Sequence, residues 1–267
     1  MAMDGSRIAV ALSTSPYLIF TCLKTKMEYH LKLLLPASTV AISSTKCISA
    51  SNNIISIFDI SPSKLKDKDI QKSHIDATDI TVSLESVKHL SFLDISTLLI
   101  MCSNGDWFIY CLLTMSTLSH TTSVRGLSAG NCYRINRNSW KISGGYKDGN
   151  VRSWIVCFDR QKSTFSITPM PLLCSLGDHI TCIEMYGNIV LSGSWDAKVR
   201  IWESRSSNRG MTLRRTLLNK ANHSPIMSLT FDNDTIITGH YNGTITVWDF
   251  SLPDYLNPRH GTKRVKI

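Results

Sequence analysis

The sequence predicts an all-β fold in which one four-stranded antiparallel unit recurs along the chain. Three observations support this prediction: short alternating apolar runs of strand length, turns rich in Asn, Asp and Gly, and an aromatic residue that returns at a regular interval. No segment stands out as a helix. Repeats of this length are typical of folds built from copies of one small sheet.

The repeat is clearest in VLSGSWDAKVRIWES, residues 190–204, where Trp202 follows the turn residue Asp196 by six positions. The same offset recurs in two close copies and three weaker ones: Asp148 and Trp154, Asn242 and Trp248, Asn104 and Tyr110, Asn52 and Phe58, Thr14 and Phe20. The aromatic anchors near 20, 58, 110, 154, 202 and 248 are therefore separated by 38 to 52 residues. This period has room for four strands.

The period around Trp202 shows where the four strands lie. HITCIEMY and GNIVLSGS precede the anchor strand, and MTLRRTLLN follows it. Four-stranded antiparallel sheets arranged radially fit this repeat, and this arrangement leaves only short strand edges exposed. We therefore predict a β-propeller with about six recognisable four-stranded units, forming a single domain over residues 1–267.

The segments LSGSWDAKVRIWE, ISGGYKDGNVRSW and IITGHYNGTITVWDF resemble blades of the WD-repeat family. The resemblance implies a structural network of a histidine, a Ser or Thr in the second strand, the turn aspartate and the tryptophan. The matching residues are Ser192, Asp196 and Trp202; Ser143, Asp148 and Trp154; and Thr238, Asn242 and Trp248. The histidine is mostly absent: Leu176 stands at its place in the best unit, and only His223 comes near it. Stability is therefore expected to differ between repeats.

The first and last units are predicted to be incomplete. SRIAVALS reads as the second strand of the first unit, with only a few residues before it, and the final residues of the chain supply one outer strand. The pattern thus favours an incomplete seven-bladed ring that lacks native N-terminal sequence. The alternative is a degenerate closure that the pattern does not reveal.

Three segments depart from the periodic pattern. Residues 61–79 are charged and poor in aromatics, which predicts a solvated charged loop with a chance of docking a partner. Residues 159–173 form a second long connection. Residues 251–267 form a basic tail with Arg259, Lys263, Arg264 and Lys266.

Composition favours a packed intracellular protein. The chain is 43% hydrophobic and 18% charged, and no apolar run is long enough to span a bilayer, so we expect no membrane insertion. The first residues do not read as a secretory leader, so we expect a cytoplasmic or nuclear location, with eight cysteines mostly buried as thiols. The formal charge of +9 favours acidic partners or nucleic acid.

The sequence offers no catalytic constellation. It contains no glycine-rich phosphate loop, and its histidines do not cluster with cysteine or carboxylates at metal-ligand spacing. Ser192 and Ser143 coincide with the structural serine of the repeat, which makes a nucleophile role improbable. We expect no enzyme activity, no cofactor, no metal and no small-molecule substrate.

The candidate binding residues come from the position just before each turn residue. In the family that this chain resembles, this position lies on the rim where ligands dock. The six residues are Ser13, Ser51, Ser103, Lys147, Trp195 and Tyr241. Trp195 and Tyr241 would be neighbours on adjacent blades beside Lys147, and exposed Trp and Tyr are enriched at interface hot spots. The alternative is that each packs over its own turn.

A second candidate is a basic surface. Residues 204–231 contain no acid, but contain Arg205, Arg209, Arg214, Arg215 and Lys220. Such a run suits a phosphate backbone or an acidic protein. A solvated outer strand is the alternative.

Taken together, these features predict a non-catalytic protein-interaction scaffold or adaptor in a multi-subunit complex. One alternative is the substrate-recognition part of an F-box type cullin ubiquitin ligase. Another is a basic accessory subunit of an RNA-modifying or ribosome-assembly complex. The fold alone does not choose among them.

Overall fold

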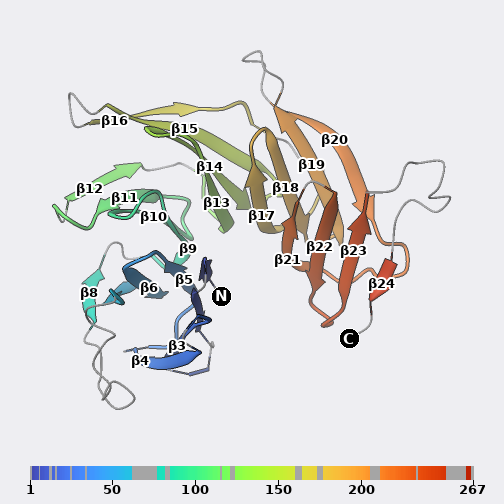
Figure 1. Cartoon of the computed structure of the whole chain (residues 1–267). Helices are drawn as coiled ribbons and strands as arrows, with labels where there is room; N and C mark the ends of the chain where they lie inside the picture. Colours follow the sequence, from blue (N-terminus) through green and yellow to red (C-terminus); the bar gives the residue numbers. More distant parts are fainter. Residues whose placement is uncertain are drawn as a thin grey trace. The chain divides into compact units, whose positions relative to one another are not determined.

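The computed structural model of the protein describes most of the chain with its side chains. The described residues are 2–5, 7–11, 14–15, 17–24, 26–33, 35–61, 77–81, 85–114, 116–120, 124–159, 164–172, 177–204, 211–232, 234–250 and 263–265. They form six four-stranded antiparallel sheets, which we name A to F in chain order (Figure 1). Among them there is no helix, and so none that could cross a membrane.

The first three sheets lie within residues 1–125. Sheet A contains β1 (Ala2–Asp4), β2 (Arg7–Ala11), β3 (Tyr17–Cys22) and β4 (Met27–Lys32). Sheet B contains β5 (Thr39–Ile42), β6 (Lys46–Ser51), β7 (Ile54–Asp59) and β8 (Thr78–Thr81), and sheet C contains β9 (Val87–Phe92), β10 (Thr97–Cys102), β11 (Trp107–Cys111) and β12 (Ser116–His120).

The other three sheets lie within residues 126–267. Sheet D contains β13 (Leu127–Asn136), β14 (Ser139–Tyr146), β15 (Val151–Asp159) and β16 (Thr164–Pro169). Sheet E contains β17 (Ile180–Tyr186), β18 (Ile189–Ser194), β19 (Lys198–Ser204) and β20 (Met211–Leu218). Sheet F contains β21 (Ile226–Phe231), β22 (Thr235–His240), β23 (Ile245–Asp249) and β24 (Lys263–Val265).

Each sheet is a meander in which consecutive strands pair. The predicted aromatic anchor lies on the third strand of every sheet and is buried: Phe20, Phe58, Tyr110, Trp154, Trp202 and Trp248 are all at most 6% exposed. This confirms the all-β fold and the six four-stranded units. The first unit is not short of a strand, as the sequence suggested, because three residues are enough for β1 to pair with β2.

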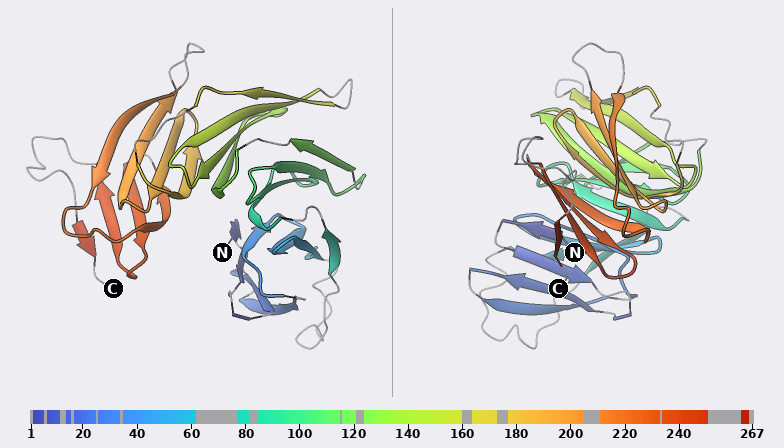
Figure 2. Two further views of the ribbon diagram at one scale, coloured as in Figure 1. Left: turned by 180° about the vertical axis from the view of Figure 1, so that it is seen from behind. Right: turned by 90° about the vertical axis from the view of Figure 1, so that its right-hand side faces the viewer.

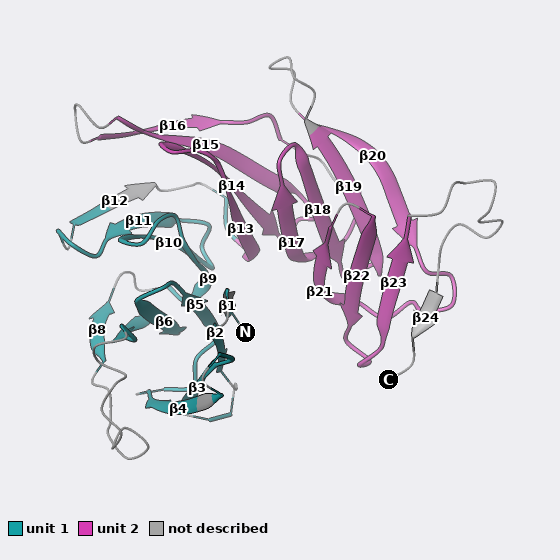
Figure 3. Cartoon of the chain, viewed as in Figure 1, with its two compact units in different colours: residues 1–125 teal, residues 126–267 magenta. Residues whose placement is uncertain are grey.

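The sheets group into two compact units, residues 1–125 and 126–267, with three sheets each (Figure 3). Within the second unit the first strands of neighbouring sheets are in contact, β13 with β17 and β17 with β21. Within the first unit β5 contacts β9 in the same way. Figure 2 shows sheets D to F from two further sides. The prediction that residues 1–267 form one domain stays a prediction.

Each of the three segments that depart from the repeat pattern contains all or part of a strand: β8, β16 or β24. The charged loop 61–79 ends in β8, and residues 62–76 lie outside the described residues. The long connection 159–173 contains β16, which completes sheet D. In the tail 251–267, only β24 is described, and it pairs with β23 as predicted for an outer strand.

The thiols follow the prediction in part. Cys47 and Cys102 are buried and Cys157 is exposed, while Cys174 lies outside the described residues. Burial raises the pKa of the Cys47 thiol to about 12, and it raises that of Cys182 to about 12 as well. Both thiols are therefore protonated and unreactive at neutral pH.

Neighbouring sheets within a unit share apolar clusters. Sheet E gives Leu191, Val199 and Leu217 to a cluster with Ile226, Leu229, Ile236 and Trp248 of sheet F. Its other face packs Ile183, Met185 and Trp202 against Ala129 and Val151 of sheet D. Because a single four-stranded sheet cannot bury both of its faces, the packing of successive sheets supplies the core.

Hydroxyl groups on the first strands also join neighbouring sheets. Thr181 lies at a β-bulge of β17, and its Oγ1 donates to the carbonyls of Gly193 in its own sheet and Ile226 in sheet F, the former at 3.1 Å. Ser128 of β13 does the same with Gly145 and Ile180. In sheet F, the exposed Met227 takes the bulge position.

We expect Thr181→Val to lower the free energy of unfolding by about 1–2 kcal/mol, because it removes the hydroxyl that donates to both carbonyls. Urea denaturation measures the effect. Thr212→Val, on the exposed outer strand β20, is the matched control and should change stability by less than about 0.5 kcal/mol. Equal effects of the two substitutions would contradict the bridging role of Thr181.

Lys141 is an unusual buried cation. Its side chain on β14 is 5% exposed, and its Nζ lies 3.1 Å from the sulfur of Met211. A thioether is a weak acceptor, so it does little to offset the lost hydration of the ammonium. Burial accordingly lowers the pKa of Lys141 from 10.5 to about 8.

We expect Lys141→Met to stabilise the protein at pH 7 by up to about 3 kcal/mol, which corresponds to this pKa difference. The native state releases the Lys141 proton near pH 8, whereas the unfolded chain keeps it until about pH 10.5. Wild-type stability should therefore rise over this window relative to the variant. Parallel stability curves for the two proteins between pH 7 and 10.5 would refute the assignment.

Candidate functional site

The turns between second and third strands share one hydrogen bond. The side-chain Oδ1 of the turn residue accepts the N–H of the residue two positions later, at 3.1 Å for Asp196, 3.0 Å for Asp148 and 3.2 Å for Asn242. The residue directly after the turn residue has a positive φ. It is Gly149 or Gly243 in two turns, and Ala197 with φ 60° in the third. This Asx geometry explains why Asp and Asn recur at this position.

Two of these turns are reinforced by an arginine four residues later. Arg200 contacts Asp196 with both terminal nitrogens, at 2.6 and 3.3 Å, and Arg152 contacts Asp148 at 2.7 and 3.3 Å. Burial alone would raise the pKa of Asp196, but the hydrogen bond and charge of Arg200 outweigh it and hold this pKa below its usual range. The hydrogen bond from Arg152 lowers the pKa of Asp148 to about 2.

The network implied by the family resemblance is present in part. Trp202 Nε1 donates to Ser192 Oγ at 3.1 Å, as expected. In sheet D, Ser143 instead bonds to Ser153 at 2.6 Å. The turn aspartates of both sheets bond to arginine, which sequence reasoning did not assign.

In sheet F a histidine of the second strand, His240, bonds to the network residue Thr238. His240 is buried, and its ring nitrogens lie 2.9 Å from the carbonyl of Ser224 and 3.1 Å from the hydroxyls of Thr238 and Thr246. His223, which comes near the histidine position in the sequence, is exposed. The sequence signal for His240 was its position two residues after Thr238, which places both side chains on one face of β22.

The rim residues are held by their backbone. The N–H groups of Lys147, Trp195 and Tyr241 donate to carbonyls that precede the first strand of the same sheet, at 2.8, 2.9 and 2.9 Å. Lys147 is exposed, Trp195 is 46% exposed and Tyr241 is 72% exposed. Of the other rim positions, Ser51 is buried and Ser103 bonds to Glu85, while Ser13 lies outside the described residues.

Two of the three predicted binding residues are brought into ring contact. The centroids of Trp195 and Tyr241, from sheets E and F, lie 6.3 Å apart. His179 lies almost parallel to Trp195, with centroids 6.1 Å apart and an interplanar angle of 8°. We call His179, Trp195, Tyr241 and the nearby Lys147 the rim patch. His179 was not singled out from the sequence, because its contact with Trp195 joins two different loops.

The charge of Lys147 acts on the rim patch. Partial burial lowers the pKa of His179, the charge of Lys147 lowers it further, and Asp178 opposes them. The imidazole is therefore predominantly neutral at pH 7, and its Nε2 has no hydrogen-bond partner among the described residues. The described residues contain no cluster of three metal-ligating side chains. The patch is suited to contact with another surface.

The predicted basic surface is not gathered into one cluster in the described part of the chain. Arg214 pairs with Glu203 at 2.6 Å, whereas Arg215, on the other face of β20, lies 6.0 Å from the ring of Phe250. Lys220 is exposed beyond the end of β20. Arg205 and Arg209 lie outside the described residues. A role in binding nucleic acid stays a prediction.

We expect Arg200→Met to destabilise the protein by roughly 1–2 kcal/mol at pH 7, a value between those for exposed and buried ion pairs. Because the native pKa of Asp196 is lowered, the pair stabilises the fold above the unfolded-state pKa near 3.8 and loses this effect as the pH falls through the native pKa. Urea denaturation at pH 7 and pH 3 should therefore show a gap between wild type and variant that narrows in acid.

The matched control is Arg152→Met, which should cost less because the Asp148 side chain is 41% exposed, against 19% for Asp196. An Arg200→Met gap that is independent of pH would show that its effect comes from packing and not from Asp196.

Comparison with known proteins follows this geometry. The family model described as WD domain, G-beta repeat, matches residues 170–203 and 212–249. These residues contain β17, β18, β21, β22 and β23, and all but one residue of β19 and of β20. No curated protein matches the sequence significantly.

Solved structures give a broader likeness, with 1201 matching chains. One is a chain of the structure described as "Crystal Structure of Mitotic Checkpoint Complex". It matches with a TM-score of 0.70 and 13% identity, over 92% of this chain and 72% of that chain. At this identity the likeness concerns the fold. The chain therefore contains WD repeats at residues 170–203 and 212–249, and its six meanders with buried anchors resemble WD-repeat β-propellers in fold.

Proposed function

We propose that the protein is a non-catalytic interaction scaffold of the cytoplasm or nucleus, and that its rim patch binds a partner protein in a multi-subunit complex. The observation that carries this proposal is the pair Trp195 and Tyr241. These side chains come from adjacent sheets, lie 6.3 Å apart, and remain 46% and 72% exposed.

The exposure of the pair argues against a purely structural role. An aromatic side chain that packed over its own turn would be covered, whereas Tyr241 presents most of its surface to solvent. Trp and Tyr release large amounts of apolar surface from water on binding, at little cost in side-chain entropy. The pair therefore has the properties of an interface hot spot.

The backbone contacts of the rim support binding without rearrangement. Trp195 and Tyr241 each donate a backbone hydrogen bond to the loop before the first strand of their sheet, at 2.9 Å. The Asp196–Arg200 pair fixes the turn directly after Trp195. A surface that is ordered before binding loses less entropy in the complex.

The family supports the coarser part of the proposal, since WD-repeat propellers generally serve as interaction scaffolds. Lys147 adds a positive charge at the edge of the aromatic pair, which favours a partner with an acidic group beside an apolar side chain. The separation of Arg214 from Arg215 gives less support to the nucleic-acid alternative. No feature of the patch itself selects a ubiquitin ligase.

The test begins with affinity purification from the native cell, with and without nuclease, to identify partners. Binding of the purified protein to a purified nuclease-resistant partner is then measured by calorimetry. We expect Trp195→Ala together with Tyr241→Ala to weaken binding at least about 100-fold, which corresponds to the loss of two hot-spot side chains.

The matched control is Tyr186→Ala, since Tyr186 is 64% exposed at the end of β17, away from the rim. It should leave the affinity unchanged. Unchanged binding in the double variant would remove the rim patch from the proposal. Partners that disappear with nuclease would favour the nucleic-acid alternative.

A further inference from the structure

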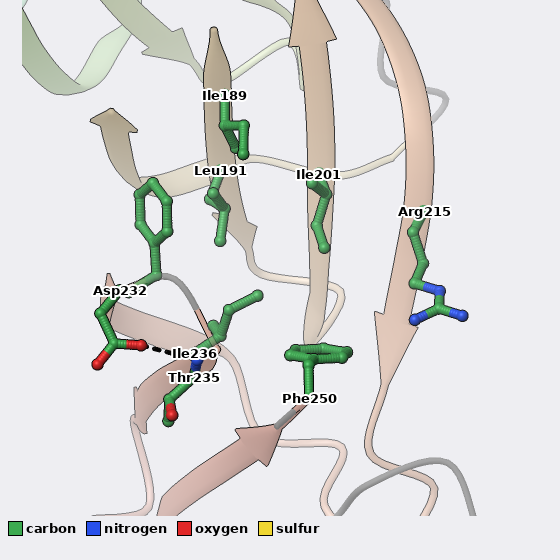
Figure 4. Close-up of a pocket in the computed structure, with 9 residues that line it drawn as sticks. Ile189, Leu191, Ile201, Arg215, Asp232, Thr235, Ile236 and Phe250 are labelled. Carbon is green, nitrogen blue, oxygen red and sulfur yellow. Dashed lines mark hydrogen bonds between the residues drawn. The ribbon is translucent and has the colours of Figure 1, made fainter. Parts of the chain in front are cut away.

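A second surface feature lies between sheets E and F, away from the rim patch. It is an open pocket with a volume of about 190 Å³ (Figure 4). Ile189, Leu191 and Ile201 line it from sheet E, and Phe231, Ile236 and Phe250 from sheet F and its end. An apolar cavity of about 150 Å³ can hold a benzene molecule, so this pocket has room for one phenyl or branched aliphatic side chain.

Strand register explains why the pocket is open. On the face of sheet E toward sheet F, Val199 pairs with Leu217, and both are buried in the shared apolar cluster. In the next row, Leu191 pairs with Ile201, and Ile201 pairs with Arg215. Arg215 therefore takes the position on β20 that Leu217 has beside Val199. Its long side chain does not fill the space between Ile201 and Phe250.

Arg215 also gives the pocket a charge. Its guanidinium lies 6.0 Å from the centroid of Phe250, and no carboxylate of the described residues forms an ion pair with it. The neighbouring Arg214, by contrast, is paired with Glu203 on the other face of β20. Among the described residues, the guanidinium of Arg215 thus has hydrogen-bond donors without a carboxylate partner, at the edge of an apolar pocket.

Asp232 gives the pocket a direction. It lies on the side of the pocket away from Arg215 (Figure 4), and its Oδ1 accepts the N–H groups of Asp234 and Thr235 at 3.1 and 2.8 Å. A carboxylate on a ligand is attracted to Arg215 and repelled by Asp232. The carboxylate end of a bound segment must therefore point toward β20.

We propose that this pocket binds a peptide segment of a partner protein in which one large apolar side chain is flanked by an acidic residue. The apolar side chain enters between Ile201 and Ile236, and the carboxylate forms a charge-assisted hydrogen bond with Arg215. The volume of the pocket selects a large apolar side chain, and the charge of Arg215, which no carboxylate of the described residues neutralises, selects an acidic neighbour.

This site goes beyond the proposed function, because it is separate from the rim patch. Ile189 and Trp195 stand at opposite ends of β18, six residues apart, which is about 20 Å in a strand. The protein could hold one partner at the rim and a second segment here. Failure of one site would not affect the other.

The probe is a fluorescein-labelled synthetic peptide with one phenylalanine between two aspartates, binding to the full chain measured by fluorescence anisotropy. NMR of the isoleucine methyl groups reports where it binds, and the signals of Ile189, Ile201 and Ile236 should shift. We expect Arg215→Gln to weaken binding about tenfold or more, as the loss of a charge-assisted hydrogen bond implies.

Arg214→Gln is the matched control, with the same change of charge one residue away, and it should leave peptide affinity unchanged. Trp195→Ala with Tyr241→Ala should also leave it unchanged, which separates this test from that of the rim patch. Since Arg215 is exposed, its substitution is not expected to impair folding.

Three results would overturn the proposal. The first is equal affinity for a peptide whose aspartates are replaced by lysines, or whose phenylalanine is replaced by alanine. The second is methyl shifts confined to residues outside the pocket, or no binding at all. The third is that Arg215→Gln weakens binding of a single-stranded RNA oligonucleotide but not of the peptide, which would assign Arg215 to nucleic acid.

Discussion

The packing of each sheet against its neighbour is the constraint on which the rest of this structure depends. A four-stranded meander has two faces, and sheet E buries one against sheet D and the other against sheet F. The aromatic anchor on the third strand is buried in every sheet and adds a large apolar side chain to this packing. Hydroxyls at the bulges of the first strands, such as Thr181, add hydrogen bonds between the same sheets.

The surface features follow from the two ends of this packing. At one end, short Asx turns follow the rim residues, and arginine reinforces the turn after Trp195. Trp195 and Tyr241 meet because their sheets are neighbours. At the other end, the apolar row that fills the space between sheets E and F stops at Arg215, and a pocket opens. The incomplete packing at this end follows from the strand register, which pairs Ile201 with Arg215.

Sequence reasoning succeeded where the signal was local and repeated. The six-residue offset between turn and anchor depends only on the geometry of one hairpin, and all six anchors are buried on third strands as predicted. It failed where a contact depended on one unit's own substitutions. The bonds of His240 to Thr238 and Thr246 were not predicted, and β1 was missed because three residues are too few to show an alternating pattern.

The sequence by itself therefore determined the all-β class, the four-stranded repeat and its anchors, because alternation, turn chemistry and spacing act within a few residues along the chain. Only the tertiary structure decided which of these side chains meet. His179 reaches Trp195 from another loop, Arg214 and Arg215 diverge to opposite faces of one strand, and Arg215 lies over Phe250 of the next sheet. Such contacts arise from the packing of sheets, and residues that are distant in the sequence carry no local record of it.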